Sequence, residues 1–340
     1  MKNGVRMIDI AEKLGVSVVT VSNALAGRDG VSDSVRRKIC DTAGKMGYKP
    51  SNTGKSHKKN IHAGIGRSIA ILTSERFVGD KGTFYWKLTA NISNRLSAMN
   101  ILTVYECITR KNERNCIIPS TVSEHKVDGV IIIGQLRRDF LFLISKSDIP
   151  VVCVDFYVSR CEFDSVNSDS YYGGYIITDH LVERGHKKIG FIGNINATSS
   201  INDRFLGYIK CLIENELEIR REWFLDDRDD TGTLFERISF PEDMPTAFVC
   251  NSDETAFRVI SALRQKGVRV PEDISIVGYD NYTVSNICVP AITTVEVDIE
   301  QMASESVDIM LKKLGNPDYR EGRKIISGKL VVKDSTIDIG

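Results

Sequence analysis

Beyond Ser68 the sequence alternates short apolar runs with amphipathic segments, and this alternation restricts the possible folds more than any other feature. Helical spacing of apolar residues marks Tyr85–Met99 and Gly173–Glu183 between such runs. Repeated alternation predicts parallel sheets with helices on both faces, and such sheets bind ligands at the carboxyl ends of their strands. The runs are numerous enough for two sheets: Ile69–Thr73, Leu102–Tyr105, Gly129–Ile133, Pro150–Val154, Ile189–Ile192, Ala247–Cys250 and Ser275–Tyr279.

The first 50 residues follow a different pattern, that of short helices. Gly15 ends a first apolar stripe, and Ser17 is a suitable N-cap for a second helix that carries Val21 and Leu25. A third helix is expected from Ser32 to Gly47. Three short helices with a glycine in the first turn predict a helix-turn-helix head. The predicted fold class is therefore an all-α helix-turn-helix head joined to an α/β core of two doubly wound parallel-sheet lobes.

Residues 51–60 contain almost nothing to bury, and residues 51–67 are expected to form a linker. Residues 1–60 contain 12 Lys and Arg against 5 Asp and Glu, whereas the rest of the chain contains 33 against 40. A basic head on an acidic body indicates that the head meets an anion, for which nucleic acid is the usual candidate. Gly54–Ser56 matches the end of a phosphate-binding loop, but Lys49 stands where its first glycine belongs, which argues against an NTPase.

Cysteine and histidine show no pattern typical of a metal or redox site. The eight cysteines include no Cys-x-x-Cys pair, and Cys153 and Cys250 lie in apolar runs where a thiol is usually a small buried group. The histidines lack metal-ligand spacing, and His186 is expected to make a structural hydrogen bond. Neither a metal nor another cofactor is expected. Because no signal peptide and no apolar run of about 18 residues is found, a cytoplasmic protein is expected.

Several segments resemble the lactose-repressor (LacI-type) family of transcription regulators. In the head they are Ile8–Ser17, Thr20–Gly27, Val31–Ser32 and Gly47–Pro50. In the core they are Val127–Ile131, Pro150–Val152 with Asp155, Gly185–Gly193, Val270–Asp280 and Leu330–Thr336. The resemblance therefore covers nearly the whole chain.

The resemblance implies a homodimeric, sequence-specific transcription regulator, expected here to be a repressor without enzymatic activity. Each head would place its second helix in the major groove of near-palindromic, double-stranded operator DNA. The core, like periplasmic binding proteins, would bind a small-molecule effector, expected to be a sugar, in the cleft between its lobes. The expected domains are a head at 1–50, a hinge at 51–67 and a core at 68–340, with a first lobe at about 68–166 and 293–323 and a second at about 167–292 and 324–340.

On the expected second helix, Val18, Val19 and Asn23 correspond to the base-reading positions of the family. An exposed valine pair suits thymine methyl groups and asparagine suits adenine, although the valines could instead help to pack the head. Thr20 and Ser22 are better placed for phosphates. The full expected DNA-binding set is Ser17, Val18, Val19, Thr20, Ser22, Asn23, Tyr48, Lys55 and His57.

The linker departs furthest from the family pattern. Relatives usually have asparagine, alanine and leucine where this chain has Ser51, Gly54 and His57, and that leucine wedges into the minor groove. Glycine in a helix costs about 1 kcal/mol relative to alanine, and imidazole is a poorer wedge, whereas the negative groove favours Lys55 and a protonated His57. A less helical hinge and a small operator bend are expected.

The resemblance places the effector contacts on Asp155, Arg204, Ser252 and Asp280. Carboxylates and a guanidinium suit a ligand with many hydroxyl groups, and aromatic rings stack on sugar rings. An aromatic cluster at a helix start is also typical of core packing. Ser252 stands where the family usually has asparagine, which indicates an atypical ligand or orientation. The aromatic part of the expected set is Phe84, Tyr85 and Trp86.

Two other classes of protein fit part of the sequence. An enzyme on a doubly wound fold is one, but the sequence contains no Gly-x-Ser-x-Gly, no complete phosphate loop and no nucleophile paired with a base. A secreted sugar receptor is the other, and it would fit the core alone. The basic helix-turn-helix head and the missing export signal oppose it.

Overall fold

The computed structural model describes residues 7–25, 31–46, 67–78, 84–159 and 161–340. The chain divides into two compact units, Met1–Ala63 and Gly64–Gly340. Most of the expected linker lies outside the described residues, as do three of the expected DNA-binding residues: Tyr48, Lys55 and His57.

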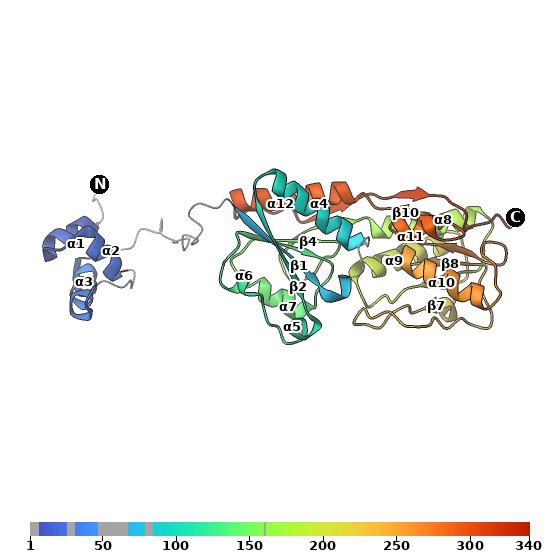
Figure 1. Cartoon of the computed structure of the whole chain (residues 1–340), viewed down its shortest axis with the longest axis horizontal. Coiled ribbons are helices and arrows are strands. Elements are labelled where there is room, and N and C mark those ends of the chain that lie inside the picture. Colours follow the sequence, from blue (N-terminus) through green and yellow to red (C-terminus); the bar gives the residue numbers. More distant parts are fainter. Residues whose placement is uncertain (1–6, 26–30, 47–66, 79–83, 160) are drawn as a thin grey trace. The chain divides into compact units, whose positions relative to one another are not determined.

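The head is the predicted helix-turn-helix unit, built from α1 (Met7–Leu14), α2 (Val18–Leu25) and α3 (Asp33–Met46) (Figure 1). Gly15 takes a φ of +64° in the turn after α1, a conformation that costs glycine little. The Ser17 hydroxyl accepts a 3.0 Å hydrogen bond from the backbone N–H of Thr20, so Ser17 caps α2 as predicted. A small apolar core joins the helices: Ile10, Ala11, Val21, Ala24, Ile39 and Ala43.

The first lobe is a parallel six-stranded sheet in the order β11-β5-β4-β3-β1-β2. Its strands are β1 (Ser68–Ser74), β2 (Leu102–Ile108), β3 (Gly129–Ile133), β4 (Val151–Val154), β5 (Asp164–Ser168) and β11 (Arg323–Ile326). On one face lie α4 (Phe84–Ala98) and α12 (Ile299–Gly315), and on the other lie α5 (Arg110–Arg114), α6 (Ser120–Ser123) and α7 (Arg138–Ile144) (Figure 1). Side chains alternate along β1, so that Ile71 packs in one core and Leu72 in the other.

The second lobe is a parallel four-stranded sheet in the order β7-β6-β8-β9. Its strands are β6 (Ile189–Ile192), β7 (Phe224–Leu225), β8 (Ala247–Cys250) and β9 (Ser275–Val277), and its helices are α8 (Ser170–Glu183), α9 (Ser199–Glu214), α10 (Asp253–Gln265) and α11 (Thr283–Ile287). The core also contains two short 3-10 turns. One is η1 (Glu75–Phe77), which follows β1 of the first lobe, and the other is η2 (Arg221–Trp223), which precedes β7 of the second lobe. The helices α8 and α9 cross so closely that a Cβ on Gly174 would lie 2.2 Å from the carbonyl oxygen of Arg204.

The chain passes from one lobe to the other after β5, after β9 and after β11. Near these crossings β10 (Thr294–Glu296) pairs antiparallel with β12 (Lys329–Val331). The strand β11 belongs wholly to the first sheet, although the expected lobe boundary at 323/324 cuts it. The apolar pattern did not predict β5 because its sequence, Asp-Ser-Val-Asn-Ser, is mostly polar, yet all five residues are buried. Asp164 there is paired with the buried Lys313.

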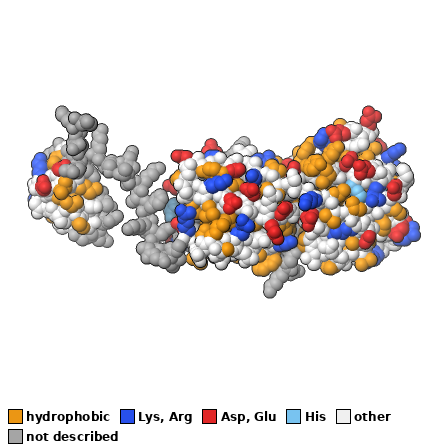
Figure 2. Space-filling view, turned by 90° about the horizontal axis from the view of Figure 1, so that it is seen from above, with side chains coloured by type: hydrophobic (Ala, Val, Ile, Leu, Met, Phe, Trp, Pro, Cys, Tyr) orange, Lys and Arg blue, Asp and Glu red, His pale blue; other side chains and the backbone are white. Residues whose placement is uncertain are grey.

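No helix in the described ranges is long and apolar enough to cross a membrane. On the face of the core seen in Figure 2, acidic and basic side chains are interspersed with apolar areas.

Candidate functional site

A cavity of about 430 Å³ lies between the two lobes of the core. Residues of the first lobe that line it are Arg76, Phe77, Phe84, Tyr85 and Asp155. Residues of the second lobe that line it are Thr198, Ser200, Ile201, Arg204, Arg228, Gly232, Leu234, Asn251, Ser252, Glu254, Asp280 and Tyr282. Its walls are therefore mixed: three arginines, three acidic residues and several hydroxyl groups stand among aromatic and apolar side chains.

Two aspartates reach the cavity from opposite lobes in the same way. Asp155 directly follows β4, and Asp280 follows β9 by a short turn. Both have left-handed backbones, with φ of +66° and +107°, which costs a residue other than glycine of the order of 1 kcal/mol or more. Each is held by its backbone N–H, which donates 2.9 Å to the carbonyl oxygen of Val166 or Val295. The strained backbone at both positions therefore directs two carboxylates into the same cavity.

In the first lobe, the Tyr85 hydroxyl donates a 2.8 Å hydrogen bond to Oδ2 of Asp155. Burial raises the pKa of the Asp155 carboxyl, although Arg204 and the Tyr85 hydrogen bond partly offset this. Burial, followed by the Asp155 charge, raises the pKa of Tyr85 well above its usual value. Tyr85 is therefore a hydrogen-bond donor at neutral pH, and Asp155 keeps Oδ1 as an acceptor.

In the second lobe, Arg204 is fixed from several sides. Its Nη1 donates 2.5 Å to the carbonyl oxygen of Asn251, its Nη2 lies 3.6 Å from Oδ1 of Asp280, and its Cζ lies 3.8 Å from the centre of the Tyr279 ring. Burial raises the pKa of Asp280 well above its usual range, and the Arg204 charge opposes that rise. Nε of Arg204 is buried and has no hydrogen-bond partner among the described residues. The guanidinium is thus held rigidly at the cavity wall.

Six of the seven residues expected to contact an effector line this cavity, and Trp86 does not. Trp86 follows Phe84 and Tyr85 on α4, but each residue of a helix points about 100° away from the one before it. The Trp86 side chain therefore does not face the cavity and is 53 % exposed. Ser252 lines the cavity, but its hydroxyl accepts a 3.2 Å hydrogen bond from Thr255 N–H and lies 3.1 Å from Thr255 Oγ1. Ser252 therefore serves first as the N-cap of α10.

Seven charged or polar lining residues are not in the expected set: Arg76, Thr198, Ser200, Arg228, Asn251, Glu254 and Tyr282. Arg228 has the clearest signal in the sequence, because it lies in the charged run Asp226–Asp230 directly after an apolar strand. Glu254 lies two residues after Ser252, at the same helix start. Arg76 and Tyr282 follow the ends of β1 and β9, where ligand-binding residues of parallel sheets gather.

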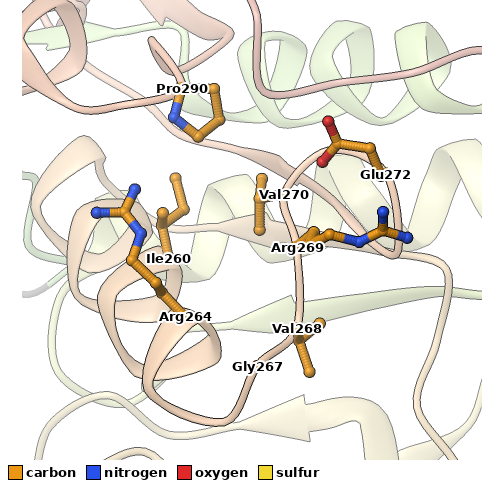
Figure 3. A pocket seen from close by; sticks show the side chains of 8 residues that line it. All are labelled: Ile260, Arg264, Gly267, Val268, Arg269, Val270, Glu272 and Pro290. Carbon is orange, nitrogen blue, oxygen red and sulfur yellow. The ribbon is translucent and has the colours of Figure 1, made fainter.

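A further hollow of about 380 Å³ lies wholly within the second lobe (Figure 3). Arg264, Arg269 and Glu272 stand at its rim with mainly apolar neighbours. Arg269 is already paired with Asp273, at 2.6 Å. None of the expected effector residues lies there, and the inter-lobe cavity is the better candidate for a ligand site.

In the head, the residues at the start of α2 are exposed as a base-reading surface requires. Val18 is 40 % and Val19 is 67 % exposed, whereas Val21 of the same helix is fully buried. Thr20, Ser22 and Asn23 are half-buried. Apolar side chains are visible on the described surface of the head (Figure 2). Such exposed apolar side chains suit contact with thymine methyl groups.

Two family models match the chain. Residues 6–51 match the model described as "Bacterial regulatory proteins, lacI family", and residues 178–336 match the "Periplasmic binding protein-like domain". The chain is 30% identical over 318 residues to the HTH-type transcriptional repressor PurR of Actinobacillus pleuropneumoniae serotype 3 (strain JL03). The matched region covers 90% of each protein.

Solved structures share the fold at lower identity. The lac repressor dimer bound to operator and the anti-inducer ONPF has a TM-score of 0.68 at 22% identity and covers 98% of this chain and 100% of its own. The complex of the transcriptional regulator CelR with cellobiose has a TM-score of 0.67 at 22% identity and covers 97% of this chain and 99% of its own. The chain therefore shares its fold with these solved structures.

Proposed function

The chain belongs to the lacI family of bacterial regulatory proteins and is a DNA-binding transcription regulator; from this premise we propose that it is a repressor whose operator affinity is set by a sugar bound between the lobes of its core. The proposal assigns ligand binding rather than catalysis to the cavity. It rests on the positions of Asp155 and Asp280, whose carboxylates line the same cavity from opposite lobes.

The charges of the cavity favour a neutral ligand with many hydroxyl groups. The three lining arginines are matched by Asp155, Glu254 and Asp280. Behind the wall, two further carboxylates pair with these arginines: Asp227 with Arg228, and Glu113 with Arg76. Because each lining arginine already has a carboxylate nearby, no unpaired cation is left among the described lining residues for a phosphate group. Removing that group from water would therefore cost free energy without compensation. Sugar hydroxyls can donate to the carboxylates and accept from the guanidinium groups.

A solved relative provides an independent argument for this class of ligand, because the CelR structure contains cellobiose. A cavity of about 430 Å³ is within the range of small-molecule sites. We expect binding to change the closure of the two lobes and so the geometry of the heads on DNA.

The proposal is tested by thermal unfolding of the full chain with neutral sugars and with the corresponding sugar phosphates. At 100 times its dissociation constant, a ligand that binds only the folded protein adds about 2.7 kcal/mol of stability. We expect neutral sugars alone to raise the transition temperature. Stabilisation by sugar phosphates and not by the parent sugars would contradict the proposed effector class.

We further propose that the protein acts as a homodimer on a near-palindromic operator. The edge strand β2 supports this, because it exposes Leu102 (49 %) and Tyr105 (47 %) beside Met99 (44 %) at the end of α4. Exposed apolar side chains on a sheet edge favour association with another chain. Sedimentation velocity should give a dimer that Tyr105→Asp weakens, and Tyr171→Asp, at an exposed tyrosine of α8, should leave intact. A monomer at operator-binding concentrations would rule out this part of the proposal.

A further inference from the structure

The connection between β7 and β8 differs from the other connections of the second sheet. Residues 226–246 form no helix, whereas α9 joins β6 to β7 and α10 joins β8 to β9. A loop of this length in a compact domain is uncommon and usually has a function. It supplies three residues to the cavity wall, Arg228, Gly232 and Leu234. Its position is fixed, because Asn194 Nδ2 donates 3.0 Å to the Arg228 carbonyl oxygen.

The Arg228 side chain is bound along one edge only. Its Nε lies 3.0 Å from both carboxylate oxygens of Asp227, and its Nη2 lies 2.7 Å from Oδ2 of Asp227 and 3.4 Å from Oδ1 of Asn251. Nη1 makes no hydrogen bond to any described residue. The side chain is 16 % exposed and lines the cavity, so the free edge of this guanidinium meets the ligand space.

Asp227 is fully buried and is itself held by other donors. It accepts hydrogen bonds from Asn194 N–H at 3.2 Å, Asn251 Nδ2 at 2.9 Å and Thr255 Oγ1 at 2.7 Å. Burial disfavours the charged form of Asp227, but Arg228 and these hydrogen bonds more than offset it, so the pKa is lowered. A carboxylate fixed in this way orients the guanidinium before any ligand arrives, which reduces the entropy lost on binding.

We propose that Arg228 is a specificity-determining residue of the effector cavity, that its Nη1 donates to an oxygen of a neutral, hydroxyl-rich ligand, and that Asp227 is its positioning residue. This inference rests on the proposed function of the cavity. A ligand without an acceptor at that place would leave a desolvated donor unpaired, and sites built around such donors reject it strongly. Glu254 and Tyr282 also line the cavity and can accept hydrogen bonds from, or donate them to, further hydroxyl groups.

The experiment measures binding by calorimetry on the full chain, with D-glucose, D-ribose and cellobiose as ligands. The monodeoxy analogues of whichever sugar binds are then compared. Arg228→Gln and Arg228→Lys remove the fork, and Arg114→Gln, at an exposed arginine of α5, is the matched control. The pair Asp227→Asn with Arg228→Gln removes both charges together, so that no buried carboxylate is left unpaired if the single variants fail to fold.

We expect one deoxy analogue to bind the unmodified protein at least tenfold more weakly than its parent sugar does. The affinity for this analogue should not fall further in the Arg228 variants or in the double variant of Asp227 and Arg228. The parent sugar should lose at least tenfold in these variants and nothing in Arg114→Gln. Lysine should not rescue binding, because an ammonium cannot hold Asp227 and a ligand in one plane.

Two results overturn the inference in different ways. If the sugar binds the unmodified protein and Asp280→Asn abolishes binding while the Arg228 variants and the pair bind normally, the effector function stands and the role of Arg228 is wrong. If none of the sugars binds the unmodified protein, the proposed sugar effector is wrong and the assignment of Arg228 fails with it.

Discussion

The guanidinium of Arg76, in the first lobe, donates a 3.0 Å hydrogen bond from Nη1 to the carbonyl oxygen of Thr231 in the second lobe. Its Nη2 donates to the carbonyl oxygen of Gln135, and it lies 3.6 Å from the buried Glu113. Nearby, Arg110 Nη1 lies 2.9 Å from Thr233 Oγ1, which is a second contact between the lobes. Two arginines of the first lobe therefore hold the loop of the second lobe that carries Arg228.

Arg76→Ala combined with Arg110→Ala should release this loop. Each lost contact is a hydrogen bond from a charged donor, worth about 1.5–3 kcal/mol when well formed and less where water replaces it. Amide hydrogens of residues 229–235 should exchange at least tenfold faster, measured by hydrogen exchange and mass spectrometry. Arg114→Ala is the control. Unchanged exchange in the double variant would mean that the loop is held by its own hydrogen bonds alone.

Arg204→Lys and Asp280→Asn should each abolish the ligand response while leaving operator binding by the head. Arg204 stacks on Tyr279 and faces Asp280 at the cavity wall, whereas the head belongs to a separate compact unit. Operator affinity is measured by fluorescence anisotropy with and without the sugar that stabilises the protein. Either variant showing unchanged ligand affinity would remove that residue from the cavity's binding set.

The parts of the fold that the sequence predicted are those in which a local pattern and the three-dimensional role coincide. In the head, the hydrogen-bond partners of Gly15 and Ser17 lie only a few residues away in the sequence, and each apolar stripe lies within a single short helix. In the core, Asp155 and Asp280 follow strands that an apolar run marks. Asp164–Ser168 was missed because its burial is compensated by partners far along the chain, such as Lys313.

The cavity residues that were missed share this dependence on distant partners. Arg76 reaches the site because Glu113 and Gln135 hold it, and Arg228 because Asp227, Asn251 and Thr255 form a network behind it. Of these contacts, only the adjacency of Arg228 and Asp227 in the charged run Asp226–Asp230 is visible in a short segment. The other contacts join residues far apart in the chain. Trp86 adjoins Phe84 and Tyr85 in the sequence, yet it does not line the cavity, because successive residues of a helix point in different directions.

Asn23→Ala should weaken operator binding by about 1–3 kcal/mol and leave affinity for random DNA nearly unchanged. Asn23 lies half-buried on α2, downstream of the exposed Val18 and Val19. The operator is first selected from a random duplex pool with the full chain, and both affinities are then measured at one salt concentration, because salt changes both. Lys38→Ala, at an exposed lysine of α3, is the comparison. Equal losses on operator and random DNA would make Asn23 a backbone contact.

The core should lose stability as the pH falls from about 6.5 to 4, and His180 should account for part of the loss. His180 is buried, and its Nε2 accepts a 3.1 Å hydrogen bond from Nε of Arg184. Burial, followed by the charge of Arg184, lowers its pKa to about 4. In this pH window the unfolded chain binds a proton at this histidine that the folded chain does not bind, so the free energy of unfolding falls as the pH falls from about 6.5 to 4.

His180→Gln tests this assignment, because glutamine keeps an acceptor for Arg184 and takes up no proton between pH 4 and 6.5. Urea unfolding at pH 7 and at pH 4.5 should show a smaller loss of unfolding free energy in the variant than in the unmodified protein. His125→Asn is the control: His125 is exposed, and asparagine tolerates its positive φ of 52°. The control should retain the full loss on acidification. If His180→Gln retains it too, the protons that destabilise the core bind elsewhere, and His186, whose pKa burial also lowers, becomes the next residue to change.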